Sequence, residues 1–413
     1  MKSNRIGIVH YSAPPVIGGV EAVIEAHARL FYHKGYSTSV IAGRGDQETL
    51  APTKYISIPL VDSQHPDILL LNSELEVGRV PKDFDKITDK LAEELSPILN
   101  QIDHLIVHNI FTKHFNLPLT VALIYLIDKG LIRQTIAWCH DMTWTSPSSR
   151  SKVFPGYPWD LLRTQHPEVT YVAVSERRQR ELAGLFNCPS DQIEVIYNGV
   201  NPSELLGLSS DGLELISRLN LLESDLNLLM PVRVTQAKNI EYAMSVLAAL
   251  KPHYRTPKLV LTGPPDPHDS ENIRYFQSLL DLRKDLGIED EMRFVYESGD
   301  DPDRPYEIDS RVVGDLYRVS DVMFMPSHRE GFGMPVLEAG LAGIPVISTN
   351  VPASQEIAKE NIMIFEASQP PQKTAEQIHN LVEKNSLVRM RRLIRTQYTW
   401  EAIFANKIKP LLG

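Results

Sequence analysis

Two glutamates flank a glycine-rich segment, and their spacing suits contacts to an elongated ligand. Glu330 precedes the turn Gly331-Phe332-Gly333, and Glu338 lies eight residues further on. Eight helical residues would span about 12 Å, whereas the two carboxylates of a glycosidase act across one bond at about 5–9.5 Å. This spacing therefore favours contacts to two parts of one long ligand over a role as a paired acid and base. The alternative is a surface helix start with two solvated glutamates.

The same segment predicts an anion-binding helix start. An apolar strand, Val322 to Met325, ends just before it, and Pro335 suits the first turn of the following helix. The first backbone N–H groups of a helix have no partners within the helix, so they attract an anion such as a diphosphate.

Parallel strands joined by crossover helices must position these residues, because short apolar runs alternate with helical patterns along the whole chain. The expected strands cover residues 5–11, 37–42, 104–108, 135–138, 171–174, 193–197, 228–234, 258–262, 292–296, 322–325 and 345–348. The expected helices cover residues 20–33, 84–101, 117–130, 176–186, 238–250, 270–286, 311–319, 334–342 and 372–386.

A polar stretch at residues 201–210 divides the two series of elements. We expect two doubly wound, parallel-sheet α/β domains, residues 1–203 and 204–395, each with its ligand crevice at the carboxyl ends of its strands. Segment 142–168 is different, because it has little periodicity and carries Arg150, Trp144, Tyr157 and Trp159. It could bind a sugar acid through its aromatic faces and guanidinium, or it could be a lid packed on the core.

Composition narrows the class of protein. The 413 residues carry 42 Lys and Arg against 52 Asp and Glu, a net charge of −10, which disfavours nucleic acid as the main partner. Cys139 and Cys188 are too few for a disulfide framework, no signal peptide is recognisable, and no apolar run reaches the roughly 20 residues of a membrane span. We expect a cytoplasmic chain. The basic clusters around Arg178 and Arg395 are expected to be solvated helix faces. A membrane surface is the alternative partner for these clusters, and it is not favoured.

Other kinds of site find little support. His104, His108 and His114 lack metal-ligand spacing, so no metal is expected. The glycine-rich segments contain neither a Walker lysine nor a dinucleotide fingerprint after the first strand.

An ordered set of motifs resembles the family 4 glycosyltransferases, which have the GT-B fold of two Rossmann-like domains facing a central cleft. The Glu-x7-Glu string at Glu330 and Glu338 is the most specific of them. The others run in order over nearly the full length: Gly18-Gly19, Trp138-Cys-His140-Asp141, Val174-Ser175-Glu176, Ile196-Tyr-Asn198-Gly199-Val200, Arg233 with Lys238, Gly263-Pro-Pro265, Gly343-Ile-Pro345-Val and Tyr398-Thr-Trp400-Glu401. The last motif resembles the family's crossover helix, so residues of about 396–413 are expected to join the N-terminal domain.

The resemblance implies a role for each charged residue. Arg233 and Lys238 would neutralise the diphosphate of a nucleotide sugar and the charge that develops as it leaves. Glu338 would bind the ribose hydroxyls, and Glu330 would face the donor sugar. His140 would contact that sugar, often at its 6-hydroxyl in the family, although a lone buried histidine is more often structural.

The resemblance also assigns ligand contacts to backbone groups. Phe332, Gly333 and Met334 would donate backbone hydrogen bonds to the sugar or phosphate, and Gly18-Gly19 would open a helix start to phosphate or acceptor. Gly263 would shape a turn in the nucleotide-binding domain. The plain alternative for Gly18-Gly19 is an ordinary tight turn.

Two departures from the family pattern affect the shape of the phosphate-binding loop. Pro231-Val232 stand where a glycine often precedes Arg233, and Asn239 stands where a glycine commonly follows Lys238.

The implied activity is metal-independent transfer of a hexose, glucose or mannose, from a UDP- or GDP-sugar to a hydroxyl of a small glycoside, sugar acid or glycan, with retention of configuration. The donor would bind the C-terminal domain and the acceptor the N-terminal domain. The alternatives are an epimerase or hydrolase of the same fold, which would turn over the donor without acceptor, and a non-catalytic nucleotide-sugar-binding protein.

Overall fold

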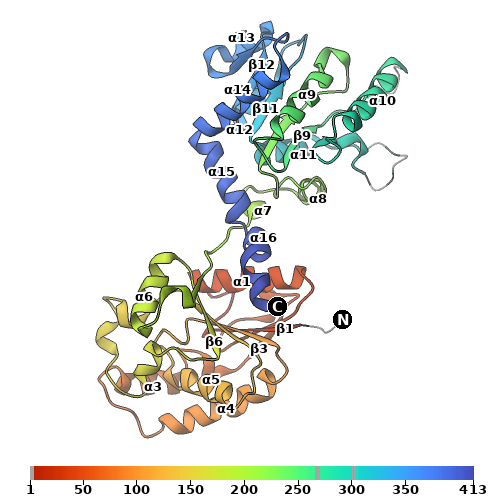
Figure 1. Ribbon diagram of the computed structural model, residues 1–413. Coiled ribbons are helices and arrows are strands. Elements are labelled where there is room, and N and C mark those ends of the chain that lie inside the picture. Colours follow the sequence, from red (N-terminus) through yellow and green to blue (C-terminus); the bar gives the residue numbers. More distant parts are fainter. Residues whose placement is uncertain (1–3, 266–269, 300, 302–303, 305) are drawn as a thin grey trace. The chain divides into compact units, whose positions relative to one another are not determined.

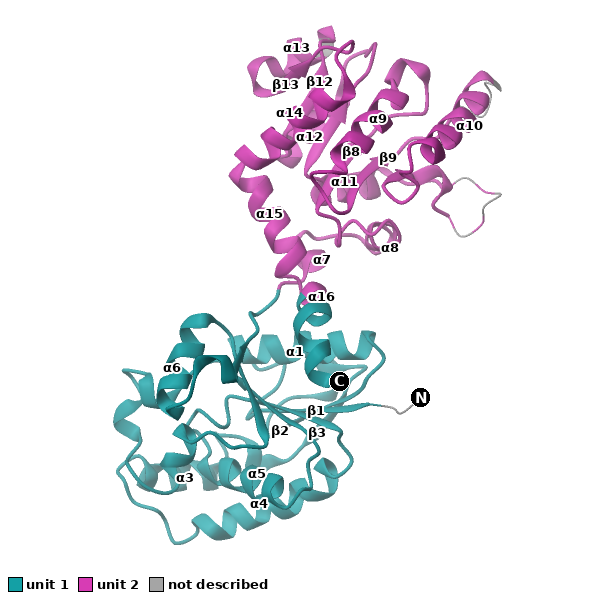
Figure 2. Cartoon of the chain, in the orientation of Figure 1, with its two compact units in different colours: residues 1–199, 403–413 teal, residues 200–402 magenta. Residues whose placement is uncertain are grey.

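The computed structural model describes residues 4–413 except 266–269, 300, 302, 303 and 305 (Figure 1). The chain divides into two compact units, which are residues 1–199 with 403–413, and residues 200–402 (Figure 2). Each unit is an α/β structure built on its own parallel sheet.

The first unit contains a seven-stranded sheet in the order β3-β2-β1-β4-β5-β6-β7. Its strands are β1 (Arg5–Val9), β2 (Ser37–Ala42), β3 (Lys54–Ser57), β4 (His104–His108), β5 (Thr135–Cys139), β6 (Val169–Ala173) and β7 (Ile193–Val195). Its α-helices before the chain leaves the unit are α1 (Gly19–His33), α2 (Gln47–Leu50), α3 (Pro66–Leu75), α4 (Phe84–Leu99), α5 (Leu117–Asp128) and α6 (Glu176–Phe186).

The second unit contains a six-stranded sheet in the order β10-β9-β8-β11-β12-β13. Its strands are β8 (Leu226–Met230), β9 (Pro257–Leu261), β10 (Met292–Phe294), β11 (Val322–Met325), β12 (Val346–Thr349) and β13 (Met363–Phe365). The remaining α-helices are α7 (Pro202–Leu205), α8 (Ser210–Arg218), α9 (Ile240–Leu250), α10 (Ser270–Asp285), α11 (Ser310–Val319), α12 (Met334–Ala342), α13 (Pro352–Ala358), α14 (Pro371–Lys384), α15 (Ser386–Gln397), α16 (Trp400–Ile403) and α17 (Lys409–Leu412).

Both strand orders contain a switch point, where the chain reverses the direction in which it adds strands. The switch lies between β1 and β4 in the first sheet and between β8 and β11 in the second. Crossover loops diverge there at the carboxyl ends of the strands, which leaves the crevice where doubly wound proteins bind ligands.

Strand periodicity separates two apolar layers on the second sheet. Leu228 of β8 and Phe324 of β11 pack in one layer, while their neighbours Leu229 and Met323 pack in the other. Alternate residues of a strand point to opposite faces, so continuous apolar strands build a core on both sides. This is why the strands appear in the sequence as unbroken apolar runs.

One basic residue expected on a solvated helix face is buried instead. Arg395 of α15 is 7% exposed and makes a bidentate pair with Asp321, at 3.0 and 2.6 Å. Asp321 also accepts a hydrogen bond from the backbone N–H of Asn227, at the second residue of β8. The prediction was wrong for Arg395 because a buried carboxylate at the start of β11 provides its partner.

The last residues of the chain return to the first unit. Phe404 packs edge-on against Phe31 of α1 and against Tyr36, and Gln134 donates a hydrogen bond to the carbonyl of Leu411 at 2.8 Å. Across the described part of the chain, no helix has the length and apolar character that crossing a membrane would need.

Candidate active site

The predicted ligand residues of the second unit gather at its switch point. Arg233 and Lys238 follow β8, Gly263 follows the neighbouring β9, and Glu330 follows β11 on the other side. The parallel register therefore brings residues almost 100 positions apart to one edge of the sheet.

Glu330 lies in a nearly enclosed polar position, with its side chain 6% exposed. Its Oε1 accepts hydrogen bonds from Lys238 Nζ at 2.7 Å and from Ser327 Oγ at 2.5 Å. The carbonyl of Ser327 in turn accepts from Thr349 Oγ1 at the end of β12, at 2.5 Å. The Oε2 atom of Glu330 has no hydrogen-bond partner among the described residues, so it can accept from a ligand.

Asn239, which stands where a glycine often follows the lysine in the family pattern, has a left-handed backbone conformation. Its φ of 53° and ψ of 49° lie in the left-handed region, which asparagine tolerates better than most residues. Its side chain donates to the carbonyl of Pro326 at 3.2 Å, and His328 N–H donates to the carbonyl of Ala237 at 2.9 Å. These bonds tie the loop after β8 to the loop after β11.

Gly263 allows two backbone segments to touch behind Arg233. A Cβ atom at position 263 would lie 2.6 Å from the carbonyl oxygen of Val232 and 2.8 Å from Cα of Arg233. Both atoms belong to the backbone, so they cannot move aside as a flexible side chain would. Gly263 N–H also donates to the carbonyl of Val232 at 3.0 Å. The glycine thus fixes the position of Arg233.

We expect Gly263→Ala to destabilise the second unit by about 1–3 kcal/mol, because the two loops must separate. Gly314→Ala is the matched control. It lies inside α11, where an added Cβ meets no atom within 4 Å, and it should stabilise the helix by up to about 1 kcal/mol. Denaturant unfolding of both variants measures the difference, and equal effects would contradict the role of Gly263.

The helix that follows Glu330 starts at an open backbone turn. Gly333 has φ 84° and ψ 40° and precedes α12 without a side-chain cap. The first N–H groups of α12 thus have no capping side chain. Phe332 and Met334 flank the glycine and are 64% and 53% exposed. A left-handed glycine here lets the chain turn sharply from the sheet into the helix.

Glu338 occupies a different environment from Glu330. It is exposed on α12, and its Oε2 accepts a hydrogen bond from the hydroxyl of Tyr317 on α11, at 2.7 Å. Burial and the bond to this carboxylate raise the pKa of Tyr317 above its ordinary value, so the phenol stays a neutral donor at pH 7. The two glutamates are thus held by separate partners rather than by each other.

Arg233 is an exposed cation in the loop after β8. It forms no ion pair or hydrogen bond with the residues that the structure describes, whereas Lys238 is paired with Glu330. An anion could bind Arg233 without displacing an internal partner.

His140 follows β5 in the first unit and is 8% exposed. Its backbone N–H donates to Asn109 Oδ1 at 2.8 Å, and its Nε2 lies 3.1 Å from Nδ1 of His108. Burial lowers the pKa of His140 to about 4, so the ring is neutral at pH 7.

Asp141, the residue after His140, is paired with a residue of a following helix. Its carboxylate forms an ion pair with Arg178 of α6, at 2.6 Å. Arg178 is thus only partly exposed, whereas its neighbours Arg177 and Arg180 are exposed, as expected of a solvated helix face. In the described residues no three His, Cys, Asp or Glu side chains are grouped so that they could hold a metal ion.

Gly18 and Gly19 stand at the start of α1 and have unequal surroundings. A Cβ atom on Gly18 would lie 2.1 Å from a carboxylate oxygen of Glu21, while one on Gly19 would meet nothing within 4 Å. Glu21 folds back over the helix start and accepts a hydrogen bond from Ser12 at 2.6 Å. Gly18 thus makes room for Glu21, whose carboxylate lies over the helix start, while the space beside Gly19 is open.

Segment 142–168 packs on the first unit and buries both of its tryptophans, while its Tyr157 is exposed. Trp144 and Trp159 are buried in an apolar cluster with residues of α3, α4 and α5. The guanidinium groups of Arg150 and Arg163 lie 4.3 and 4.0 Å from the ring centre of Trp144. The prediction of a sugar-binding aromatic surface was wrong for both tryptophans, because composition does not reveal which faces are already covered.

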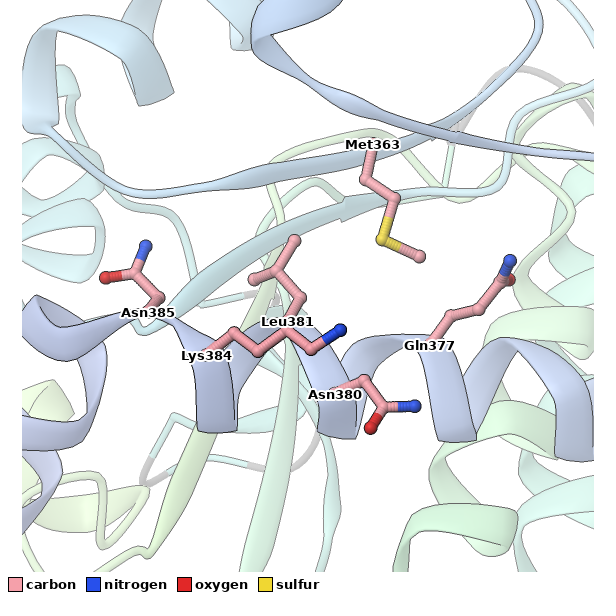
Figure 3. Close-up of a pocket in the computed structure, with 6 residues that line it drawn as sticks. All are labelled: Met363, Gln377, Asn380, Leu381, Lys384 and Asn385. Atoms are coloured by element: carbon pink, nitrogen blue, oxygen red, sulfur yellow. The ribbon is translucent and has the colours of Figure 1, made fainter.

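The second unit has a further cavity, of about 500 Å³, away from the switch point (Figure 3). It is lined by Met363, Gln377, Asn380, Leu381, Lys384 and Asn385. Met363 begins β13 and the other residues come from the second half of α14 and the residue after it, so this cavity lies at the amino end of the strand. Its position differs from that of the ligand crevice in doubly wound folds.

Sequence reasoning missed the residues that hold the predicted site residues in place through hydrogen bonds. Ser327 could have been found, because it is a polar residue two positions after a buried strand and three positions before Glu330. Asn109 carries a similar signal, because it directly follows the buried strand β4. Tyr317 carries none, since it approaches Glu338 from α11 only through the packing of that helix.

Comparisons with known proteins identify relatives of both units. The profile described as Glycosyltransferase Family 4 matches residues 17–204, and the profile Glycosyl transferases group 1 matches residues 214–399. An uncharacterised glycosyltransferase of Methanocaldococcus jannaschii is 30% identical over 46% of this chain and 45% of its own length. The mannosylglucosylglycerate synthase of Petrotoga mobilis is 24% identical over 84% of this chain and 83% of its own.

A solved glycosyltransferase of Rickettsia africae is 19% identical, with a TM-score of 0.36, over 100% of this chain and 98% of the other. The match to the Methanocaldococcus protein spans less than half of that relative. The two profiles together span most of the chain, one over each parallel-sheet unit. The chain therefore belongs to glycosyltransferase family 4 and is a glycosyltransferase of the GT-B fold.

Proposed function

We propose that this glycosyltransferase moves a hexose from a UDP- or GDP-sugar to an acceptor hydroxyl, without a metal ion and with retention of configuration. The observation that carries the proposal is the cluster of Lys238, Glu330 and Ser327 beside Arg233 at the switch point of the second sheet. It combines two cations with a carboxylate that has a free oxygen.

The diphosphate of the donor would bind Arg233, Lys238 and the backbone N–H groups of Gly333 and Met334 at the start of α12. Pro335 has no N–H, and the N–H of Val336 already donates to the carbonyl of Gly333 at 2.9 Å. Arg233, Lys238 and the helix start would together offset charge of the diphosphate, which is the usual role of a divalent metal, although Glu330 already balances part of the Lys238 charge. Arg233 is exposed and unpaired among the described residues, so it can approach a phosphate as a planar fork of donors.

The two glutamates would hold opposite ends of the donor. Glu330 Oε2 would accept hydrogen bonds from sugar hydroxyls, and Glu338 would accept them from the nucleotide ribose. Their separate partners, Lys238 with Ser327 for one and Tyr317 for the other, support two binding roles rather than one acid–base pair.

The reaction would proceed on one face of the sugar. As the bond between the anomeric carbon and the phosphate oxygen breaks, that oxygen takes the proton of the attacking acceptor hydroxyl, and the acceptor oxygen bonds to the same face of the carbon. Arg233 and Lys238 would stabilise the charge on the departing diphosphate. His140 would contact the transferred sugar as a neutral ring.

The acceptor would bind the first unit. A cavity of about 340 Å³ there is lined by Ser63, Gln64, Leu69, Asn72, Ser73, Glu76, Phe115 and Lys152. These residues come from the segments after β3, β4 and β5, and they supply hydroxyl, amide, charged and aromatic groups that suit a small glycoside or sugar acid. The Petrotoga relative is named for such a product, mannosylglucosylglycerate.

Thermal unfolding with UDP, GDP and ADP, all in EDTA, tests donor binding without metal. The correct nucleotide at one hundred times its Kd should add about 2.7 kcal/mol of stability. UDP-glucose and GDP-mannose are then supplied with glucosylglycerate in EDTA, and product is followed by mass. Stabilisation that needs Mn²⁺ would contradict metal independence. Donor turnover without acceptor would indicate a hydrolase or epimerase, and binding without turnover would indicate a non-catalytic protein.

A further inference from the structure

Four histidines gather at the switch point of the first sheet, on and beside neighbouring strands. His10 follows β1, His108 ends β4, His140 follows β5 and His27 lies on α1. The rings of His108 and His140 stack with centroids 5.4 Å apart, and His27 lies 5.4 Å from His108. His108 and His27 are fully buried, while His10 and His140 are 5% and 8% exposed.

Burial keeps these rings neutral. It lowers the pKa of His140 to about 4 and that of His27 to about 3, and it lowers the pKa values of His10 and His108 as well. Glu21 and Asp141 oppose the shifts of His10 and His140 without cancelling them. Each neutral ring carries one N–H donor and one lone pair, and its hydrogen bonds decide which nitrogen holds the proton.

The contact between His108 and His140 therefore allows two arrangements. The nitrogen atoms are His108 Nδ1 and His140 Nε2, 3.1 Å apart, and one must donate to the other. His108 Nε2 is buried without a hydrogen-bond partner. If His140 donates, the proton of His108 is left on this isolated Nε2, as a buried orphan donor. If His108 donates, only a lone pair is left there, which is the better tolerated defect.

We propose that His108 is a positioning residue that donates from Nδ1 to His140 Nε2 and so holds His140 with its proton on Nδ1. The N–H of His140 is then directed away from His108. His140 Nδ1 has no partner among the described residues, so this donor is available to a substrate hydroxyl. Asn109 fixes the backbone of His140 at the same time, through the bond from its N–H to Oδ1. Only the substrate contact rests on the proposed function.

Long-range ¹H–¹⁵N correlation spectra of the full chain, labelled with ¹⁵N-histidine, report the protonated nitrogen directly. His108→Asn and His140→Gln assign the two rings. At pH 7 and without ligand, both His108 and His140 should be Nδ1–H tautomers. An Nε2–H tautomer of His140, or a mixture of both forms, would overturn the proposal.

Variants separate this role from simple packing. His108→Asn keeps an N–H donor near the position of Nδ1 and should preserve the tautomer of His140, whereas His108→Phe should release it to a mixture. His104→Asn, at the other end of β4 and bonded to Gln134, is the matched control and should leave His140 unchanged. An unchanged tautomer of His140 in His108→Phe would overturn the proposal. If that variant does not fold, the tautomers in wild type and in His108→Asn still test the proposal.

Transfer kinetics provide a second readout. His108→Phe should lower kcat/KM for the donor roughly tenfold, about the size of one hydrogen bond, and His108→Asn should restore most of it. Near-wild-type kcat/KM in His108→Phe would overturn the assigned substrate contact. A protein that transfers no sugar would refute the proposed function and leave the tautomer result intact.

Discussion

Lys238→Ala is expected to lower the rate of glycosyl transfer by about 10²–10³-fold, the usual effect of removing one group that stabilises developing charge. It should also destabilise the second unit. Glu330 is 6% exposed and would keep only Ser327 as a partner. Leaving a buried acceptor without its donor costs about 1–3 kcal/mol. Loss of activity in this variant alone could thus reflect catalysis or folding.

A double variant separates the two effects. In Lys238→Ala with Glu330→Gln, the uncompensated carboxylate is gone, so most of the stability should return while transfer stays low. Glu330→Gln alone keeps an oxygen acceptor for Ser327 and Lys238 and tests the charge of the carboxylate.

Lys251→Ala is the matched control, because Lys251 forms a 3.1 Å pair with Glu291 elsewhere in the second unit. Steady-state kinetics and denaturant unfolding are measured on each protein. A folded Lys238→Ala variant that keeps transfer within about tenfold of wild type would refute the phosphate-binding role.

The architecture could be predicted because parallel strands are buried on both faces. Most strands of each sheet appear in the sequence as apolar runs, as Val322 to Met325 does for β11. The edge strands β3 and β13 were missed. β3 has four residues, all half-exposed or exposed, so no buried apolar run marks it. β13 is an apolar run, Met363-Ile364-Phe365, but with three residues it is shorter than an ordinary strand. Their pairing depends on the register of a neighbouring strand, which local sequence does not contain.

The candidate site could be predicted where the motif lies on one stretch of chain and less well where it depends on packing. Glu330 and Glu338 follow from their spacing, but the sequence does not show that Tyr317 holds one and Lys238 the other. For Trp144, the sequence predicted a role that the packing excludes. Its type suggests a sugar platform, yet two guanidinium groups cover its ring. Residue type states what a side chain can do, and packing decides whether it is free to do it.

Arg233→Ala is expected to separate catalysis from stability completely. Arg233 is exposed and has no partner among the described residues, so its removal should change the free energy of unfolding by less than about 0.5 kcal/mol. Transfer should nevertheless fall about 10²–10³-fold, because the departing diphosphate loses its only unpaired cation in the proposed arrangement.

The change in kcat relative to the change in KM shows whether Arg233 acts on donor binding or on the departure of the diphosphate. If Arg233 acts mainly on charge that develops as the diphosphate leaves, kcat falls more than the KM for the donor rises. Arg233→Lys keeps the charge and loses the planar fork of donors, so it should recover part of the rate but not all of it. Arg311→Ala, exposed on α11, is the control for a general effect of surface charge. Wild-type kcat in Arg233→Ala would mean that the diphosphate is neutralised elsewhere, since no change in folding could mask the loss.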